Sequence, residues 1–360
     1  MKWFSFWNNK APKNFLGIDI GTSSIRVVEL NSKQEKLSLE NYGEIKTTSL
    51  QKAPFRVIEK NGLLLSNQEV SKAISIILKT AGIKTKEVNF SIPDFSSFFI
   101  SFELPLMSER ELPQAIKYEA RSYIPLPLSE VTLDWSIIEG KNNGKSKESL
   151  KVLVAAIPNE IISRYQEIAV LTGLEMIALE AEAFALSRAL AGDKKEIIGI
   201  IDIGVRSTTV NILEKGILKL SYSINLSGNE LTEAIVSSLD VEYEKAENLK
   251  QELGLINEEI DKENLKKILI PLVDSILNEI KKVLQSFYEQ EGKEVEKIIL
   301  AGGTAFLPGL KEYFFDKLKK ETEIANSFQK ISYPANLEEV LKEMRPTYAI
   351  PIGLAMKGLE

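Results

Sequence analysis

Apolar and polar residues follow one another in a similar pattern at two places in the chain. Residues 15–30 and residues 197–213 each contain an apolar run, a short polar turn and a second β-rich run. Short apolar runs flanked by glycine and hydroxyl residues are typical of strands joined by a turn, so each stretch predicts a β-hairpin. Both turns begin with the tripeptide Asp-Ile-Gly. This recurrence predicts that the two halves of the chain are duplicated.

The stretch between the two repeats has a different rhythm. Residues 86–173 predict the order strand, strand, helix, strand, strand, helix. The first of these helices is predicted over residues 108–123, where Ser108 and Glu111 have the spacing of a capping box. The second is predicted over residues 159–171. A complete ββαββα unit at this place predicts an inserted subdomain.

Helical patterns and one further glycine turn fill the rest of the chain. Residues 229–296 have the apolar spacing that predicts helices packed on one face. A third strand, over residues 298–301, is followed by Gly302 and Gly303, and residues 347–356 predict a closing helix of small residues. Together these patterns predict an α/β protein with two similar halves and an insertion.

The composition excludes many kinds of active site. The 360 residues include no cysteine and no histidine, so a disulfide, a thiol nucleophile, a Cys/His zinc site and a histidine general base are all impossible. Carboxylates, hydroxyls, Lys, Arg, backbone amides and a hard cation such as Mg²⁺ remain. The net charge of −6 argues against a nucleic acid as the main partner, because phosphate binding needs a clustered basic face.

The first seven residues are apolar but far shorter than the roughly 20 residues that span a bilayer, and we predict no signal peptide. Four aromatic residues in this segment can contact a membrane interface or a partner, or can belong to a loosely docked terminus. They are Trp3, Phe4, Phe6 and Trp7.

The two Asp-Ile-Gly turns contain the groups needed to surround a phosphate. Backbone amides of small residues can point at phosphate oxygens, and hydroxyl groups add further donors. An Asp ends the strand before each turn, and two such carboxylates can hold a hydrated Mg²⁺. The candidate phosphate ligands are Gly21, Thr22, Ser23, Ser24, Gly204 and Ser207, and the candidate Mg²⁺ ligands are Asp19 and Asp202.

A single turn of this kind is most often an ordinary β-turn whose Asp accepts local amide hydrogens. Two copies, one in each half, favour a nucleotide site. Gly302 and Gly303 favour it further, because a base or ribose can lie flat against glycine. Neither the P-loop nor the G-x-G-x-x-G pattern occurs at a strand–helix junction in this sequence, so we expect a phosphate site of another kind.

The three glycine turns resemble the first phosphate loop, the second phosphate loop and the adenosine motif of the actin–Hsp70–sugar kinase superfamily. Residues 180–183 and 351–355 resemble its two connecting helices, and residues 246–250 resemble the helix that contacts the ribose. The resemblance implies an α/β actin-like ATPase fold of two duplicated ribonuclease-H-like halves. The insertion is similar to the 1C subdomain of FtsA-like proteins, an SHS2-like ββαββα unit.

Residues 115–127 resemble the signature helix of PilM-like proteins, the actin-like family of type IV pilus assembly, and residues 133–135 and 226–228 resemble further segments of that family. The resemblance implies a cytoplasmic ATP-binding adaptor of type IV pilus assembly, or of a related type II secretion-like assembly, peripheral at the inner face of the inner membrane. Its implied partner is the N-terminal cytoplasmic peptide of the inner-membrane protein PilN. The implied subdomains are 1A (residues 1–85, 174–195 and 338–360), 1C (86–173), 2A (196–228 and 297–337) and 2B (229–296).

The resemblance also implies a role for each candidate residue. The residues implied near the phosphates are Gly21, Thr22, Ser23, Ser24, Gly204 and Ser207, and those near Mg²⁺ are Asp19 and Asp202. The residues implied near the ribose are Glu247 and Lys250, and those near the adenosine are Gly302, Gly303 and Thr304. The residue implied near the attacking water is Glu180. The first turn lacks the lysine that actin and Hsp70 carry, so we expect at most slow, Mg-dependent ATP hydrolysis. Arg206 either replaces that cation or lies at the surface.

Several alternatives stay open at this point. The strand at residues 98–104 offers either an edge for an extended peptide or ordinary core packing. The alternatives to an adaptor are an FtsA-like, filament-forming, membrane-associated ATPase and a small-molecule kinase of the same fold. A homo-oligomer is compatible with each of them.

Overall fold

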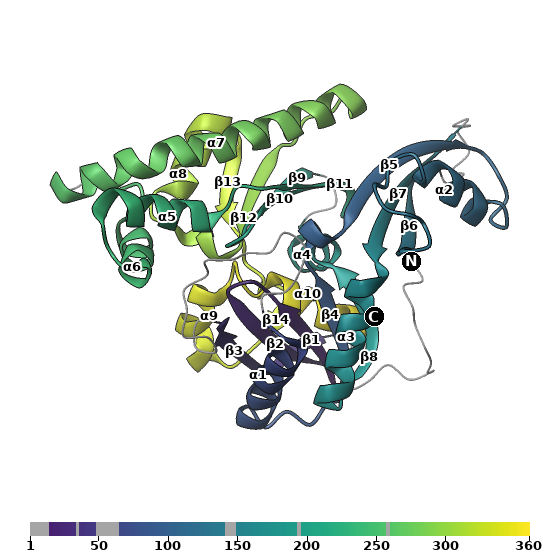
Figure 1. The fold of residues 1–360 in the computed structure, drawn as a ribbon, viewed down its shortest axis with the longest axis horizontal. Helices are drawn as coiled ribbons and strands as arrows, with labels where there is room; N and C mark the ends of the chain where they lie inside the picture. The colour runs from purple at the N-terminus through teal and green to yellow at the C-terminus, as the bar shows by residue number, and fades with distance from the viewer. Residues whose placement is uncertain (1–13, 34–35, 48–64, 141–148, 193–195, 257–259) are drawn as a thin grey trace.

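The computed structural model places two large sheets in two halves and a third, smaller sheet in an insertion (Figure 1). The first half lies at the bottom of Figure 1, the second half at the top, and the insertion projects to the upper right. The four aromatic residues near the N-terminus lie outside the described residues. The structure describes residues 14–33, 36–47, 65–140, 149–192, 196–256 and 260–360.

Five strands of the first large sheet have the same order as the five strands of the second, which confirms the predicted duplication. The first half has the antiparallel strands β1 (Asn14–Ile20), β2 (Ser24–Lys33) and β3 (Lys36–Lys46), with β4 (Glu87–Ile92) and β8 (Glu175–Ala181) parallel on the other side of β1. The second half has the antiparallel strands β9 (Ile197–Ile203), β10 (Thr208–Glu214) and β11 (Ile217–Ile224), with β12 (Lys297–Ala301) and β13 (Glu321–Ile324) parallel on the other side of β9.

Helices cover both faces of the first sheet, which explains why β1 is buried from Phe15 to Ile20 and is mostly apolar. On one face, Leu16 and Ile18 pack with α1 (Asn67–Thr80) and α3 (Asn159–Thr172). On the other face, the sheet packs against α4 (Glu182–Leu190) and α10 (Ala349–Leu359).

The helices α4 and α10 lie between the two sheets and join the halves. One apolar core contains residues of both helices, of β2 in the first half and of β9 and β10 in the second half. The two helices approach so closely that a Cβ atom on Gly353 would lie 2.0 Å from the carbonyl oxygen of Ala185. No side chain fits at this crossing, so the small residues of the closing helix set the distance between the helices.

The insertion is smaller than the sequence predicts. Its three-stranded sheet has the order β5 (Phe98–Pro105), β7 (Ser149–Pro158), β6 (Val131–Glu139), and α2 (Leu112–Ala120) covers it. The strand predicted at its start is β4, which belongs to the first large sheet, and the helix at its end, α3, packs on α1. The predicted 86–173 unit is therefore wrong at both ends: its first strand and its last helix belong to the first half. The periodicity of the sequence identifies a strand but not the sheet that it joins.

The return to the first half also comes earlier than predicted. The short strand β14 (Ile331–Ser332) pairs with β3, so the chain has left the second sheet before residue 338. The short helix α9 (Glu338–Met344) follows it. The helices α5 (Gly228–Leu239), α6 (Tyr243–Leu253) and α7 (Ile260–Glu291), together with α8 (Leu310–Leu318), pack in the core of the second half.

Replacing Gly353 by Ala tests the contact between α4 and α10. In an isolated helix this change is favourable by ~1 kcal/mol. Here the added methyl group meets the Ala185 backbone, so we expect Gly353→Ala to lower the free energy of unfolding by about 3 kcal/mol, the upper end of the cost of overpacking. Urea denaturation of both proteins measures this difference in the free energy of unfolding.

Gly192→Ala is the matched control, because a Cβ atom there meets nothing within 4 Å. It should change the stability by less than about 0.5 kcal/mol. A stabilised Gly353→Ala protein would show that the helices do not cross this closely.

Candidate nucleotide-binding cleft

The two predicted phosphate turns have the same backbone geometry. Gly21 donates its N–H to the carbonyl oxygen of Ser24 at 3.0 Å, and Gly204 donates its N–H to that of Ser207 at 2.9 Å. The first turn is fixed by Thr47, whose backbone N–H and hydroxyl donate to the carbonyl oxygens of Ser23 and Thr22. Each turn therefore presents the edge of a β-hairpin in one defined conformation.

The start of α5 fixes the second turn. Gly228 donates its N–H to the carbonyl oxygen of Gly204, and the Ser227 hydroxyl donates to that of Val205. A Cβ atom on Gly228 would lie 2.3 Å from the Thr304 hydroxyl oxygen. The Leu-Ser-Gly segment at residues 226–228 thus packs the helix onto both the second turn and the segment that follows β12.

One cleft between the halves brings most of the predicted residues together. Its lining includes three residues of the first turn, the second turn, both Asp residues and the glycine pair after β12. From the predicted set these are Asp19, Gly21, Thr22, Ser23, Asp202, Gly204, Ser207, Gly302 and Gly303. Ser24 closes the first turn through its backbone, but its side chain is buried outside the cleft.

The glycine pair has two distinct roles. Gly302 has a φ of +83°, and a Cβ atom on it would lie 2.3 Å from Asp202 Oδ1, so only glycine fits where β12 ends beside β9. Gly303 has no neighbour within 4 Å of its Cβ position. It therefore leaves an open surface in the cleft against which a flat group can lie.

Glu247 and Lys250, the predicted ribose ligands, form a buried network on α6 beside the cleft. Lys250 Nζ donates to Glu247 Oε2 at 2.7 Å, to the Thr232 hydroxyl at 2.7 Å and to the carbonyl oxygen of Gly228 at 3.0 Å. The network connects α6 to the start of α5. Neither side chain is among the residues that line the cleft, and Thr304 is not among them either.

Four acidic side chains lie in or beside the cleft: Asp19, Glu182 and Asp202 line it, and Asp94 begins the turn that carries Phe95. Burial raises the pKa of Asp202 to about 7, and the charge of Asp19 adds to this effect. Burial likewise raises the pKa of Asp94 to about 7. It raises the pKa of Glu182 well above its usual range, helped by the charges of the other three. A cation would allow these groups to ionise together.

Asp19 is the acidic group with the most compensation. Burial raises its pKa, but Arg26 Nη1 lies 3.6 Å from its Oδ2 atom and the Ser91 hydroxyl donates to Oδ1 at 2.8 Å. No three acidic side chains in the described residues converge closely enough to hold a metal ion directly. The donor set suits Mg²⁺ bound mainly through its own water molecules, with Asp19 and Asp202 nearest to the two turns.

Glu180 does not lie in the cleft, contrary to the sequence prediction. It is the second-to-last residue of β8 and is fully buried, with its carboxylate bound by Arg188 at 2.8 and 2.9 Å and by Lys357 at 3.0 Å. Burial would raise its pKa, but the hydrogen bonds and charges of the two cations outweigh burial and lower it. Glu180 therefore connects α4 to α10 and is not available to a water molecule.

Glu182, two residues later, lines the cleft instead. The sequence prediction missed it, although Glu182 and Ala185 repeat the E-x-x-A spacing of Glu180 and Ala183. It also missed Phe95 and Asp94. Phe95 lines the cleft, and Arg206 of the second turn lies with its guanidinium carbon 4.1 Å from the centre of the Phe95 ring. No local motif marks Phe95, because its contact with Arg206 joins residues that lie far apart along the chain.

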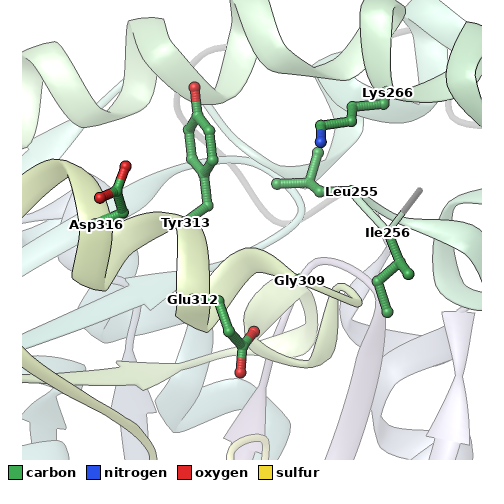
Figure 2. A pocket seen from close by; sticks show the side chains of 7 residues that line it. All are labelled: Leu255, Ile256, Lys266, Gly309, Glu312, Tyr313 and Asp316. Carbon is green, nitrogen blue, oxygen red and sulfur yellow. The ribbon is translucent and has the colours of Figure 1, made fainter.

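A second pocket lies in the second half, between the end of α6, the start of α7 and α8 (Figure 2). Glu312 and Asp316 line it together with a single Lys266, and the Tyr313 hydroxyl donates to Asp274 at 2.7 Å. Its lining contains neither of the two glycine turns whose amides and hydroxyls can surround a phosphate. The cleft between the halves is therefore the candidate nucleotide site.

Comparison with known protein families identifies the family of this chain. A sequence profile described as "Type IV pilus assembly protein PilM" matches residues 17–359. The chain belongs to the PilM family. No helix among the described residues combines the length and apolar character needed to cross a bilayer.

Solved structures similar to this PilM-family chain show the actin-like ATPase fold. A chain of the PilM-PilN type IV pilus biogenesis complex matches with a TM-score of 0.84 and 23% identity, over 98% of this chain and 100% of that chain. EutJ from Carboxydothermus hydrogenoformans matches with a TM-score of 0.58 and 16% identity, over 97% and 91%. MreB5 of Spiroplasma citri, solved with ADP bound, matches with a TM-score of 0.55 and 14% identity, over 96% and 95%.

Curated relatives include the cell division protein FtsA of Enterococcus faecalis and of Bacillus subtilis. The first is 22% identical over 94% of this chain and 86% of its own length. The second is 20% identical over 87% of this chain and 78% of its own length. Both support the actin-like relationship of the PilM-family chain.

The pKa values of the buried acids predict opposite effects of two neutral substitutions. The pKa of Asp94 is about 7 in the folded protein and ~3.9 in an unfolded chain. The neutral form therefore stabilises the fold, fully below about pH 4, and this stability is lost as the pH rises through about 7. Asp94→Asn stays neutral, so its melting temperature relative to the parent should rise between about pH 5 and about pH 8.

Glu180→Gln is the matched control with the opposite sign. The lowered pKa of Glu180 means that its ionised form stabilises the fold, at every pH above its unfolded value of ~4.3. Glu180→Gln should therefore lower the melting temperature by a similar amount at both pH values. Scanning calorimetry of both variants measures the melting temperatures. A difference between Asp94→Asn and the parent that does not change with pH would refute the raised pKa of Asp94.

Proposed function

We propose that this protein is an ATP-binding adaptor of type IV pilus assembly, which binds nucleotide in the cleft and the cytoplasmic N-terminal peptide of a PilN-type inner-membrane protein beside the insertion. The observation that carries the nucleotide half of the proposal is the convergence, in one cleft, of a glycine pair and two glycine turns that are closed by the same kind of hydrogen bond. Membership of the PilM family carries the other half. Such a partner would keep the protein at the inner face of the inner membrane.

The residues present suit a Mg-nucleotide. The phosphates would lie between the first turn and the second, where amides and hydroxyls supply donors and Asp19 and Asp202 would neighbour the cation. The cation would supply charge neutralisation for the phosphates. The ribose would lie toward Glu247 and Lys250, and the adenosine against Gly302, Gly303 and Thr304. The similar MreB5 structure was solved with ADP.

Hydrolysis in this site would be slow. The first turn has no lysine, and positioning and charge neutralisation dominate phosphoryl transfer. Glu182 is the carboxylate beside the cleft that can orient a water molecule, since Glu180 is held by Arg188 and Lys357. ATP would then act chiefly as a structural ligand that holds the halves together.

The peptide would lie along β6, an edge strand of the insertion. Residues 132–137 of this strand are partly exposed, and an extended peptide can add to such an edge through main-chain hydrogen bonds. Asp134 lies in this segment with its Oδ2 atom buried and without a hydrogen-bond partner among the described residues. Its pKa is raised to about 6 by burial, opposed by the nearby charge of Lys357, which places this part of β6 near α10.

Filament formation is the second candidate function, because FtsA proteins are among the relatives. Pelleting of the purified protein with Mg-ATP at high concentration tests it, and the adaptor proposal expects the protein to remain in the supernatant.

Gly303→Val tests the nucleotide site without disturbing the fold. A Cβ atom on Gly303 faces open space, so the stability without nucleotide should not change. The valine side chain would occupy the surface proposed for adenosine, and we expect calorimetry with Mg-ATP to give a Kd at least about tenfold weaker, or ~1.4 kcal/mol. Gly192→Val is the control outside the cleft. A Kd for Gly303→Val equal to that of the parent would show that adenosine does not lie against Gly303.

Asp134→Ala tests the peptide site. The parent should bind a synthetic PilN-type N-terminal peptide with 1:1 stoichiometry in calorimetry. Because the Asp134 carboxylate has an unpartnered buried oxygen, its removal should not destabilise the protein, but it should weaken peptide binding by about tenfold if that oxygen accepts a peptide N–H.

Glu103→Ala, on the opposite edge strand β5, is the matched control and should bind the peptide normally. A loss confined to Glu103→Ala would move the peptide to β5, the strand at residues 98–104 that the sequence offered. No binding by the parent would end the adaptor proposal.

A further inference from the structure

Two cationic side chains are among the described residues that line the cleft, Arg26 and Arg206. Arg26 is engaged within the first half, with Nη2 3.0 Å from Glu44 Oε1 and Nη1 3.6 Å from Asp19 Oδ2. Arg206 belongs to the second turn, and its guanidinium carbon lies 4.1 Å from the centre of the Phe95 ring. The arginine of the second half thus rests on an aromatic ring from the other side of the cleft.

Phe95 is held firmly where it stands. It lies in the 3₁₀ turn Asp94–Ser96, between β4 and the first strand of the insertion. Asp94 donates its N–H to Glu182 Oε2 at 3.1 Å, and its own Oδ1 accepts the N–H of Ala183 at 3.1 Å. This reciprocal pair fixes the turn to the start of α4, so the Phe95 ring has a defined position in the cleft wall.

A guanidinium has a flat face and an edge that carries its N–H donors. Its N–H groups lie in its plane and point outward from its edge, whereas the ring contacts only its face. A cation within about 6 Å of a ring centre is attracted to it, and more strongly where water is excluded. Arg206 is half-buried, so water is partly excluded there, and this burial lowers its pKa. Contact with Phe95 therefore favours one orientation of the guanidinium beside the second turn.

We propose that Phe95 is a positioning residue for nucleotide binding, which holds Arg206 with its guanidinium edge toward the polyphosphate. Arg206 then supplies the cation that the first turn lacks. This inference rests on the proposed nucleotide function and deepens it. Because Phe95 precedes β5, the same contact connects the phosphate site of the second half to the segment that leads into the insertion.

Calorimetric titration of Phe95→Leu with Mg-ATP and, separately, with adenosine tests this role. We expect Phe95→Leu to bind ATP about tenfold more weakly, within the range of about 3- to 30-fold expected for a partly buried cation–π contact. Adenosine has no phosphate for Arg206 to contact, so its affinity should not change. Phe95→Tyr keeps the ring and should bind ATP like the parent.

Two further variants complete the design. Arg206→Ala should lose ATP affinity, and Phe95→Leu combined with Arg206→Ala should lose no more than Arg206→Ala alone, because the two residues act as one unit. Phe99→Leu is the matched control. The Phe99 ring packs 6.0 Å from the Phe184 ring and does not line the cleft, so this variant should bind both ligands like the parent.

The outcomes separate this inference from the proposed function. A parent that binds no ATP would overturn both. If the parent binds ATP and Phe95→Leu binds it equally well, the nucleotide site stands and the inference is wrong. Equal losses for ATP and adenosine would also overturn it, since Phe95 would then only maintain the shape of the cleft.

One alternative variant keeps the test decisive if Phe95→Leu does not fold. Arg206→Lys retains the charge but not the planar group that stacks on Phe95. It should lose affinity for ATP and not for adenosine, and an ATP affinity equal to that of the parent would overturn the inference.

Discussion

The contact between α4 and α10 is the constraint on which the rest of the structure depends. At Gly353 the two helices touch backbone to backbone, and the apolar core around them includes strands of both halves. This packing places the start of α4, with Glu182, and the start of α10, with Ile350, in the wall of the same cleft. The position of the candidate nucleotide site is therefore a consequence of how closely two helices can approach.

The same junction explains why two nearby carboxylates behave in opposite ways. Glu180 lies near the end of a strand and pairs with Arg188 and Lys357, whose charges lower its pKa despite full burial. Glu182 begins the next helix and faces Asp19, Asp94 and Asp202, which raise its pKa. The first group stabilises the joint between the helices. The second belongs to a cleft with an excess of buried negative charge, which a hydrated cation and Arg206 can offset.

The sequence predicted the features that local patterns determine. The two hairpins and the glycine turns were found because burial on both faces of a sheet requires apolar strands, and a close approach requires glycine. The boundaries of the insertion were not found, because the apolar pattern of β4 shows that it is a strand but not which sheet it joins. The sequence could not choose between Glu180 and Glu182, which share one spacing two residues apart. Phe95 carries no signal, because its role depends on a contact with Arg206, far along the chain.

The insertion contacts both halves, which connects its position to that of the cleft. It is joined to the first half through the chain, and Lys219 of β11 donates to the carbonyl oxygen of Ile138 and to Glu139 on β6, each at 3.0 Å. Lys151 of β7 also pairs with Glu291 at the end of α7. Lys219 is 7% exposed, so separating this contact would leave a nearly buried charge to be rehydrated. Movement of the halves about α4 and α10 must therefore either carry the insertion along or break these pairs, and a peptide held on β6 would experience that movement directly.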